Sequence, residues 1–254
     1  MLSKRRALFI GINYYGTSKA LRGCIYDTIN VRNMLIDAYQ YESNNIVMLR
    51  DDTKDPVKRP TRENILKELQ SLIDDSNSCS EIFFMYNGHG TRIQDENGDE
   101  PTDNKDECIL SVDGKVITDD ELFAIIQHAK CKCTLLFDSC NSGTICDLQW
   151  TFSWQAGNVI VTDTNKNPIT QNPHIYVLSG SRDDESGYDV YNRDYIQYGG
   201  AFTNTFMECL RSGHHKLRYV DLYTNICKKM QENGYAQTPQ MSLSGQSADE
   251  LFLH

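Results

Sequence analysis

Short runs of apolar residues recur along the chain, each separated from the next by an amphipathic or polar segment. A run that is apolar throughout, rather than alternating, is typical of a strand covered on both faces. We therefore expect strands at Arg6–Ile12, Ile46–Arg50, Ile82–Tyr86, Thr134–Phe137 and Ile175–Leu178. Cys108–Val112 is a shorter and weaker candidate.

The segments between these runs carry apolar residues at helical spacing. The clearest begins at Thr61, which suits the N-cap position, and has Glu63 in the first turn, where an acid complements the helix dipole. Gly234 is a reasonable stop signal for the last of these segments. The pattern predicts helices at Asp27–Tyr39, Thr61–Ile73, Asp119–His128, Gly200–Arg211 and Val220–Glu232.

Strands that alternate with helices predict an α/β fold with a mainly parallel sheet and helices on both faces. A length of 254 residues allows one large domain or two small ones, and we expect a single domain over residues 1–254. Three long polar segments interrupt the pattern, and such loops are often functional. We expect loops at Asp51–Pro60, Thr91–Lys105 and Thr162–Pro173.

The composition is that of a globular protein with an acidic balance. Hydrophobic residues make up 39% of the chain, and the net charge is −10. Residues 94–107 alone hold seven of the 35 acidic side chains. Nucleic-acid binding needs clustered Lys and Arg, so we expect no nucleic-acid partner. An acidic chain suits cationic partners, either basic peptides or metal ions.

The short N-terminal apolar run and the pattern of cysteines together indicate a reducing compartment. The apolar run at residues 7–12 is too short for a signal peptide, and nothing approaches the roughly 20 apolar residues that span a membrane. The nine cysteines form neither a secreted-type framework nor a Cys-x-x-Cys zinc motif. We expect a cytoplasmic protein with free thiols, no membrane partner and no structural zinc.

Two predicted strands end in Gly-bearing turns with reactive side chains. "IFFMYNGHGT" delivers His89, and "LLFDSCNSGT" delivers Cys140. Taken alone, a Cys after a strand is more often buried and inert, and a His in a turn is more often solvated. If the two strands are parallel neighbours, the pair lies on one rim, where the imidazole would favour the thiolate for acyl transfer. The N–H groups of Gly90 and Cys140 could then face a developing oxyanion.

These residues carry a resemblance. "YNGHGT" and "DSCNSGT", in this order, resemble the His and Cys motifs of metacaspases, which are caspase-like cysteine peptidases. "ALFIGINYYGTSKALRGCIYD", "DECILSVDGKVITDDEL", "YVLSGSRDDESGYD" and "TPQMSLSG" also fit, so the resemblance extends from residue 6 to about 245. The sequence departs from the usual motifs at Asn87, where the family has Ser, and at Asn141, where it has His. We also expect no Pro- or Gln-rich N-terminal extension of the kind that many type I members carry.

The resemblance implies a caspase-like three-layer α/β/α sandwich. Residues 1–160 would correspond to the large-subunit part and residues 174–254 to the small-subunit part, joined by a flexible loop. His89 would be the general base and acid, and Cys140 the nucleophile. Metacaspases cut after Arg or Lys and generally work as monomers. The implied partners are therefore peptide or protein substrates with Arg or Lys at the cleaved position.

A pocket for the basic side chain is also implied by the resemblance, with Cys24, Asp27 and Asp138 lining it and Asn87 in the Ser position. The residues themselves are consistent with this assignment. Cys24 and Asp27 have i, i+3 spacing, and two carboxylates in one cleft would be joined by a substrate cation. An acid at a helix N-terminus is an equally good reading of Asp27 from the residues alone.

Calcium is the implied cofactor. The acidic segment is not an EF-hand, and most of its charges suit a solvated face. The family's calcium site uses dispersed aspartates, and carried over these are Asp106, Asp119, Asp120 and Asp147. Hard oxygen ligands from several parts of the chain suit Ca²⁺, which takes six to eight oxygens. We expect calcium to order the cleft and so to switch activity on.

Self-processing is common in metacaspases, as is a role in programmed cell death. Lys166, which we expect to be an exposed residue in a long flexible loop, is the candidate self-cleavage site. Two alternatives to an Arg- or Lys-directed peptidase stay open. One is a non-proteolytic scaffold or calcium-responsive binding protein that kept the fold. The other is a caspase-like peptidase of different specificity, for example one that cuts after Asp.

Overall fold

The structure is a computed structural model. It describes residues 4–94, 105–139, 145–146, 148–164, 166, 168–169, 171–180, 189–192 and 197–253. Two of the sequence predictions, Cys140 and Asp147, lie outside the described residues.

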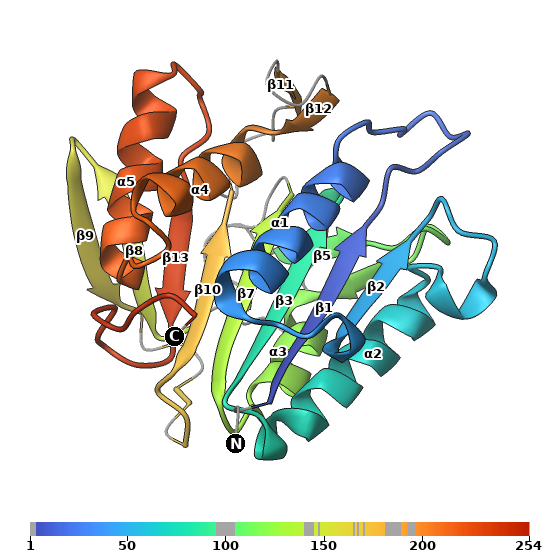
Figure 1. The fold of residues 1–254 in the computed structure, drawn as a ribbon, viewed down its shortest axis with the longest axis horizontal. Coiled ribbons are helices and arrows are strands. Elements are labelled where there is room, and N and C mark those ends of the chain that lie inside the picture. The colour runs from blue at the N-terminus through green and yellow to red at the C-terminus, as the bar shows by residue number, and fades with distance from the viewer. Residues whose placement is uncertain are drawn as a thin grey trace.

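An eight-stranded sheet in the order β2-β1-β3-β7-β10-β13-β8-β9 forms the centre of the molecule (Figure 1). The first five strands in this order are parallel neighbours, and the last three pair antiparallel. The parallel strands are β1 (Arg5–Gly11), β2 (Ile46–Arg50), β3 (Glu81–Asn87), β7 (Lys132–Asp138) and β10 (Ile175–Ser179). The antiparallel strands are β8 (Trp150–Gln155), β9 (Asn158–Asp163) and β13 (Gln240–Leu243).

Helices cover both faces of this sheet and give three layers. The helices are α1 (Cys24–Tyr39), α2 (Arg62–Asp74), α3 (Asp119–Ile126), α4 (Ala201–Ser212) and α5 (Tyr219–Glu232). Side chains of α1, α4 and α5 share one buried cluster with alternate strand residues such as Phe9. Those of α2 and α3 share the opposite cluster with residues such as Leu8. The expected three-layer α/β/α architecture and mainly parallel sheet are therefore confirmed.

The five apolar runs predicted as strands are all strands, and the five predicted helices are all helices, with ends shifted by a few residues. Helix α2 starts as expected, because the Thr61 hydroxyl accepts a hydrogen bond from the N–H of Asn64. Helix α1 starts at Cys24, three residues before the predicted start at Asp27. The sequence pattern was reliable wherever a segment is buried along its whole length.

Several other strands were not predicted. The predicted loop Thr91–Lys105 contains most of β4 (Gly90–Gln94), which pairs with β5 (Lys105–Leu110) in a small sheet completed by β6 (Val116–Thr118). Strand β9 is mostly exposed, so its residues lack the apolar pattern of a covered strand. A further two-stranded sheet joins β11 (Asp189–Asn192) and β12 (Gln197–Gly200), and short 3₁₀ turns occur at Ser43–Asn45, Pro56–Lys58 and Asp75–Ser78.

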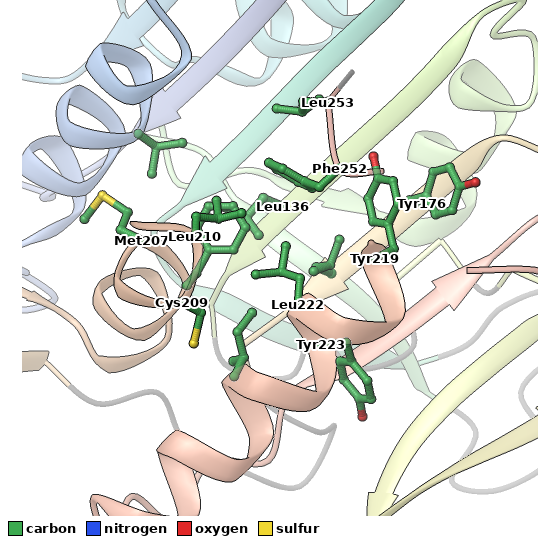
Figure 2. Packing of buried hydrophobic residues seen from close by; sticks show 14 of the residues in the cluster. Leu136, Tyr176, Met207, Cys209, Leu210, Tyr219, Leu222, Tyr223, Phe252 and Leu253 are labelled. Atoms are coloured by element: carbon green, nitrogen blue, oxygen red, sulfur yellow. The ribbon is translucent and has the colours of Figure 1, made fainter. Parts of the chain in front are cut away.

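The last part of the chain packs tightly onto the sheet (Figure 2). Tyr219 of α5 stacks on Tyr176 of β10 with ring centroids 3.8 Å apart, and Phe252 meets Tyr219 edge-on. Strand order also interlocks the two parts of the chain. Strands β8 and β9 precede β10 in sequence, yet β8 pairs with β13 on the far side of β10. Residues 4–163 and 175–253 therefore share one sheet.

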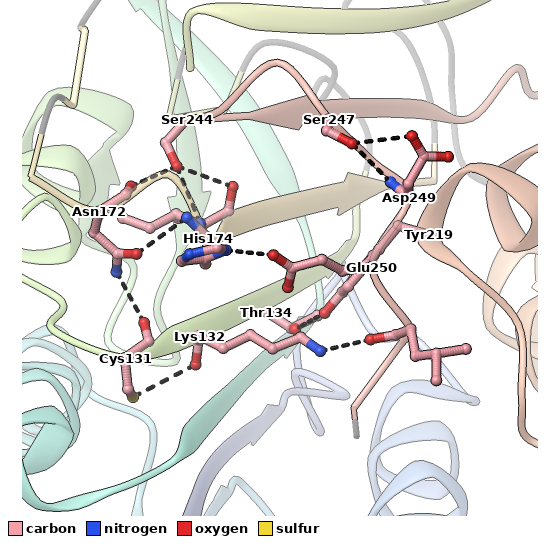
Figure 3. Close-up of polar contacts among 12 residues, drawn as sticks. Cys131, Lys132, Thr134, Asn172, His174, Tyr219, Ser244, Ser247, Asp249 and Glu250 are labelled. Carbon is pink, nitrogen blue, oxygen red and sulfur yellow. Dashed lines mark hydrogen bonds and ion pairs between the residues drawn. The ribbon is translucent and has the colours of Figure 1, made fainter.

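Polar contacts hold the amino ends of the strands (Figure 3). The Lys132 ammonium donates to the carbonyl of Leu251, and the Asn172 side chain donates to the carbonyl of Cys131 at 2.8 Å. His174 pairs with Glu250. These contacts fix the chain terminus and the segment before β10 against β7. Within the described residues, no helix is both long enough and apolar enough to cross a membrane.

Candidate active site

The carboxyl ends of β1, β3 and β7 meet at the upper edge of the sheet in Figure 1. Gly11, Asn87 and Asp138 are the last residues of these strands and lie in register across the sheet. The two strands that lead to His89 and Cys140 are thus parallel neighbours, which is the condition for a shared rim. His89 follows β3 by two residues, and Cys140 follows β7 by the same number, although Cys140 itself lies outside the described residues.

His89 is held by four backbone and side-chain contacts. Its Nε2 lies 2.7 Å from the carbonyl oxygen of Lys19. Its backbone N–H donates to the Tyr14 hydroxyl at 3.0 Å, and its carbonyl accepts from the Tyr86 hydroxyl at 2.7 Å and from the Leu110 N–H at 3.0 Å. A carbonyl oxygen only accepts, so this contact places the proton of a neutral imidazole on Nε2. Nδ1 is then the nitrogen able to accept a proton.

Two buried carboxylates lie beside this strand end. Asp27 is 2% exposed, and its Oδ2 accepts hydrogen bonds from the Asn87 side-chain amide at 3.1 Å and from the Gly200 N–H at 2.8 Å. Asp138 is 8% exposed, and its Oδ2 accepts from the Thr203 hydroxyl at 2.6 Å and from the Thr203 N–H at 3.3 Å. The structure therefore brings together three of the four predicted pocket residues.

The N-terminus of α4 donates backbone hydrogen bonds to both carboxylates. Gly200 is the N-cap of α4 and makes no side-chain capping bond, so Asp138 supplies a capping acceptor from another element. The positive end of the helix dipole favours negative charge at both carboxylates. A Cβ at Gly200 would collide with the Asp138 carboxylate, so only glycine allows this close approach.

Cys24 is the first residue of α1 and is buried, one helical turn before Asp27. Its thiol lies close enough to the hydroxyls of Tyr14 and Tyr86 to contribute to raising their pKa values, although burial is the larger cause for both. Gly90, the predicted oxyanion donor, begins β4 opposite Ile109 and is half-buried. Its role with Cys140 stays a prediction.

Three of the four predicted calcium ligands, Asp106, Asp119 and Asp120, lie on or directly after strands of the small sheet. Asp106 on β5 and Asp119 at the start of α3 are buried, while Asp120 is exposed. Burial, together with the nearby carboxylates of Asp119 and Asp106, raises the pKa of the Cys108 thiol to about 12, so these two carboxylates share one neighbourhood. No group of three His, Cys, Asp or Glu side chains that could hold a metal occurs among the described residues. Asp147, the fourth predicted ligand, lies outside them, so the calcium site stays a prediction.

Lys166 lies between β9 and β10, and its backbone N–H donates to the Thr164 hydroxyl at 3.3 Å. We expected this lysine to be exposed, but it is half-buried. The predicted loop at Thr162–Pro173 is also shorter than expected, because β9 continues to Asp163.

Sequence reasoning missed several residues of this site. Tyr14, Asp51, Gly200 and Thr203 reach it only through tertiary contacts with residues 36 to 173 positions away. Two local signals were available. One is the pair Gly199–Gly200 at the start of a predicted helix, and the other is Tyr14-Tyr15-Gly16 after the first predicted strand. Both mark places where the backbone is constrained, but neither indicates which distant residue is contacted there.

Comparison with known proteins agrees with this geometry. The metacaspase peptidase C14 domain matches residues 5–149. Metacaspase-1 of Kluyveromyces lactis is 34% identical over 95% of this chain, which spans 66% of that relative's length. Metacaspase-1 of Pyricularia oryzae is 32% identical over 95% of this chain, which spans 72% of that relative.

Two solved structures share the fold. Caspase-1 from Spodoptera frugiperda aligns with a TM-score of 0.61 at 12% identity, covering 98% of this chain and 92% of its own. A protein from Geobacter sulfurreducens aligns with a TM-score of 0.65 at 20% identity, covering 96% of this chain and 94% of its own. The family match covers both reactive motifs, "YNGHGT" and "DSCNSGT". The chain therefore belongs to the metacaspase family of cysteine peptidases.

Proposed function

We propose that this chain is a calcium-dependent endopeptidase that cleaves after Arg or Lys, with Cys140 as nucleophile and His89 as general base and acid. The observation that carries the proposal is the pair of buried carboxylates, Asp27 and Asp138, on either side of Gly200. The pair lies at the same sheet edge as His89 and the end of the strand that leads to Cys140.

The specificity follows from how these carboxylates are held. Among the described contacts, an amide, two backbone N–H groups and a hydroxyl donate hydrogen bonds to them. These hydrogen bonds orient the two carboxylates. A guanidinium or ammonium entering between Asp27 and Asp138 gains strong charge-assisted hydrogen bonds. An acidic substrate side chain would be repelled by both carboxylates.

The chemistry would proceed through an acyl-enzyme. Nδ1 of His89 takes the thiol proton, and the Cys140 sulfur bonds to the substrate carbonyl carbon. The carbonyl oxygen gains the electron pair and is stabilised by the N–H groups of Gly90 and Cys140. His89 then protonates the leaving amine as the C–N bond breaks. Water attacks the thioester carbonyl carbon and gives a proton to His89. The C–S bond then breaks, and the carboxylic acid and the Cys140 thiolate are released.

Calcium would be held by Asp106, Asp119, Asp120 and Asp147. Hard carboxylate oxygens are the ligands that Ca²⁺ prefers, so the chemistry of these side chains fits the ion. The bound ion would neutralise repulsion among the carboxylates and order the segment after Cys140. Titration calorimetry of the Cys140→Ala protein reads binding without activity. Asp119→Asn should weaken binding at least tenfold, and Asp249→Asn, which removes an equal charge in the network of Figure 3, should not.

Self-cleavage after Lys166 is part of the proposal. Because β8 and β9 pair beyond β13, the two products would stay in one sheet after the cut. Mass spectrometry of the active protein should show a calcium-dependent cut that Cys140→Ala lacks, while gel filtration shows no separation of fragments. A cut that also occurs in Cys140→Ala would assign it to a contaminating protease.

Fluorogenic peptides test the peptidase itself. Peptides ending in Arg or Lys should be cleaved in the presence of Ca²⁺, and Cys140→Ala or His89→Ala should abolish cleavage. Cleavage after Asp would indicate a caspase-like peptidase of different specificity. Folded protein that binds Ca²⁺ and cleaves no peptide would instead support a non-proteolytic binding protein.

A further inference from the structure

The hydroxyl of Tyr14 lies beneath the loop that carries His89. It accepts a hydrogen bond from the His89 backbone N–H at 3.0 Å and donates to the Leu110 carbonyl at 2.6 Å. Tyr86 completes the contact, with its hydroxyl 3.1 Å from that of Tyr14 and 2.7 Å from the His89 carbonyl oxygen. The peptide groups on both sides of the His89 Cα are thereby fixed by tyrosine hydroxyls.

The ring of Tyr14 fixes the imidazole as well as the backbone. The two ring centroids lie 4.7 Å apart at an interplanar angle of 41°. Gly88 lets the hydroxyls reach this position, because a Cβ there would lie 2.7 Å from the Tyr86 oxygen and 3.0 Å from the Tyr14 oxygen. Burial raises the pKa of Tyr14, so the hydroxyl stays protonated over the neutral range.

Tyr14 is itself held in an unusual backbone conformation. Its φ is +51°, in the left-handed region that costs a non-glycine residue of order 1 kcal/mol or more. Asp51, a buried residue just past β2, accepts hydrogen bonds from the N–H of Asn13 at 2.9 Å and of Tyr15 at 3.3 Å. The carboxylate thus holds the Ile12–Asn13 and Tyr14–Tyr15 peptide groups, which enclose Asn13 and Tyr14, and so supports this conformation.

We propose that Tyr14 is a positioning residue for His89 and that Asp51 acts on His89 through Tyr14. The inference rests on the proposed function of His89 as the general base for Cys140. Neither side chain contacts the substrate in this scheme. Their contribution is to keep Nδ1 of His89 aimed at the thiol while the Lys19 carbonyl holds Nε2. Small losses of alignment lower the rate of proton transfer more than they affect substrate binding.

Tyr14→Phe is the direct test, because it removes the hydroxyl and keeps the ring against His89. We expect kcat to fall about tenfold with KM changed less than about twofold. Tyr14→Ala removes the ring too and should lower kcat by about a hundredfold. An unchanged kcat in folded Tyr14→Phe would overturn the proposal.

Tyr223→Phe is the matched control. It removes an equally buried hydroxyl, which donates to the Pro239 carbonyl at 3.0 Å on the other side of the fold. It should lower the melting temperature by a similar amount and leave kcat unchanged. If both variants lose kcat in proportion to stability, the role of Tyr14 is merely structural.

The pH dependence of Cys140 alkylation separates failure of the inference from failure of the proposed function. In wild-type protein the His89 imidazole should keep the thiolate populated well below the ordinary thiol pKa of about 8.5. Tyr14→Phe should move the alkylation midpoint upward, toward that of His89→Ala. A shift in His89→Ala without one in Tyr14→Phe would refute the positioning role and leave the dyad intact. Identical profiles in wild type and His89→Ala, with no peptide cleaved, would refute the dyad and the inference with it.

Asp51→Asn supplies a second route if Tyr14→Phe does not fold. It keeps the size of the side chain but replaces one acceptor oxygen with a donor that faces a backbone N–H. The expected result is the same loss in kcat at nearly constant KM, although Asp51 does not touch His89. Full kcat in folded Asp51→Asn would contradict the proposal.

Discussion

The two ends of the parallel sheet both hold buried carboxylates, yet the described contacts of these carboxylates differ. At the amino ends, the buried Glu81 carboxylate pairs with the Arg5 guanidinium at 3.0 Å, so one protein charge balances another. At the carboxyl ends, Asp27 and Asp138 accept from amide, peptide and hydroxyl donors. The first arrangement closes the fold, and we propose that the second binds the cationic side chain of a substrate.

The difference follows from what each end must do. The amino ends carry the contacts of Figure 3, which join the chain terminus to β7 through pairs such as Lys132 with Leu251. The carboxyl ends are where open parallel sheets bind ligands, because loops leave the strands there and leave room between them. Substitutions at the amino ends should therefore change stability, and those at the carboxyl ends should change catalysis.

Among the substitutions that compare the two ends of the sheet, Asp138→Asn should lower catalysis the most. It keeps an acceptor for Thr203 but removes one of the two charges for the substrate cation. Leaving a buried cation with one partner fewer typically costs 2 to 5 kcal/mol, so kcat/KM for an Arg peptide should fall about 100- to 1,000-fold. Steady-state kinetics measure the change. A fall of less than about fivefold would show that Asp138 is not part of the specificity pocket.

The rates of thiol alkylation at the two ends of β7 provide a second comparison. Cys131 and Cys133 lie at the start of β7, where burial raises the pKa of Cys131 to about 12 and also raises that of Cys133. Cys140 follows the other end of β7, which pairs in parallel with the strand that leads to His89. At pH 7, iodoacetamide should label Cys140 at least about a hundredfold faster, because the thiolate is the reactive form. Peptide mass mapping gives the rates, and equal labelling would contradict an activated Cys140.

Gly200→Ala should give an intermediate effect. The added methyl group collides with the Asp138 carboxylate and pushes the N-terminus of α4 away from both pocket acids. We expect kcat/KM to fall about tenfold or more, with a loss of about 1 to 3 kcal/mol in stability. Gly234→Ala is the control, since it strains a glycine with φ +73° in open space after α5. It should lower stability and leave kcat/KM unchanged.

Glu81→Gln should have the smallest effect on catalysis. It leaves the partly buried Arg5 guanidinium without its carboxylate, and breaking such a buried pair costs about 3 kcal/mol. For a chain of this size the melting temperature should fall by roughly 6 to 10 °C. The kcat per folded molecule should stay within about twofold of wild type. A large loss of kcat without a loss of stability would contradict the view that the amino ends of the strands serve stability and the carboxyl ends serve catalysis.

The fold was predictable from sequence where burial is continuous, as in Ile82–Tyr86, whose residues are all covered on both faces. It was not predictable for β9, because exposed strand residues leave no apolar pattern. The site was predictable as far as the motifs at His89 and Asp138. Thr203 and Tyr14 were beyond reach, because their roles come from hydrogen bonds to residues 65 and 75 positions away, which no local pattern encodes.

The most direct test of the acidic pocket is a pair of peptides that differ only in charge. One ends in Arg and the other in citrulline, which has the same shape but a neutral urea in place of the guanidinium. With Ca²⁺ present, kcat/KM for the Arg peptide should exceed that for the citrulline peptide by at least about a hundredfold, because each carboxylate contributes charge-assisted hydrogen bonds. Equal cleavage of the two peptides would contradict a pocket built from Asp27 and Asp138.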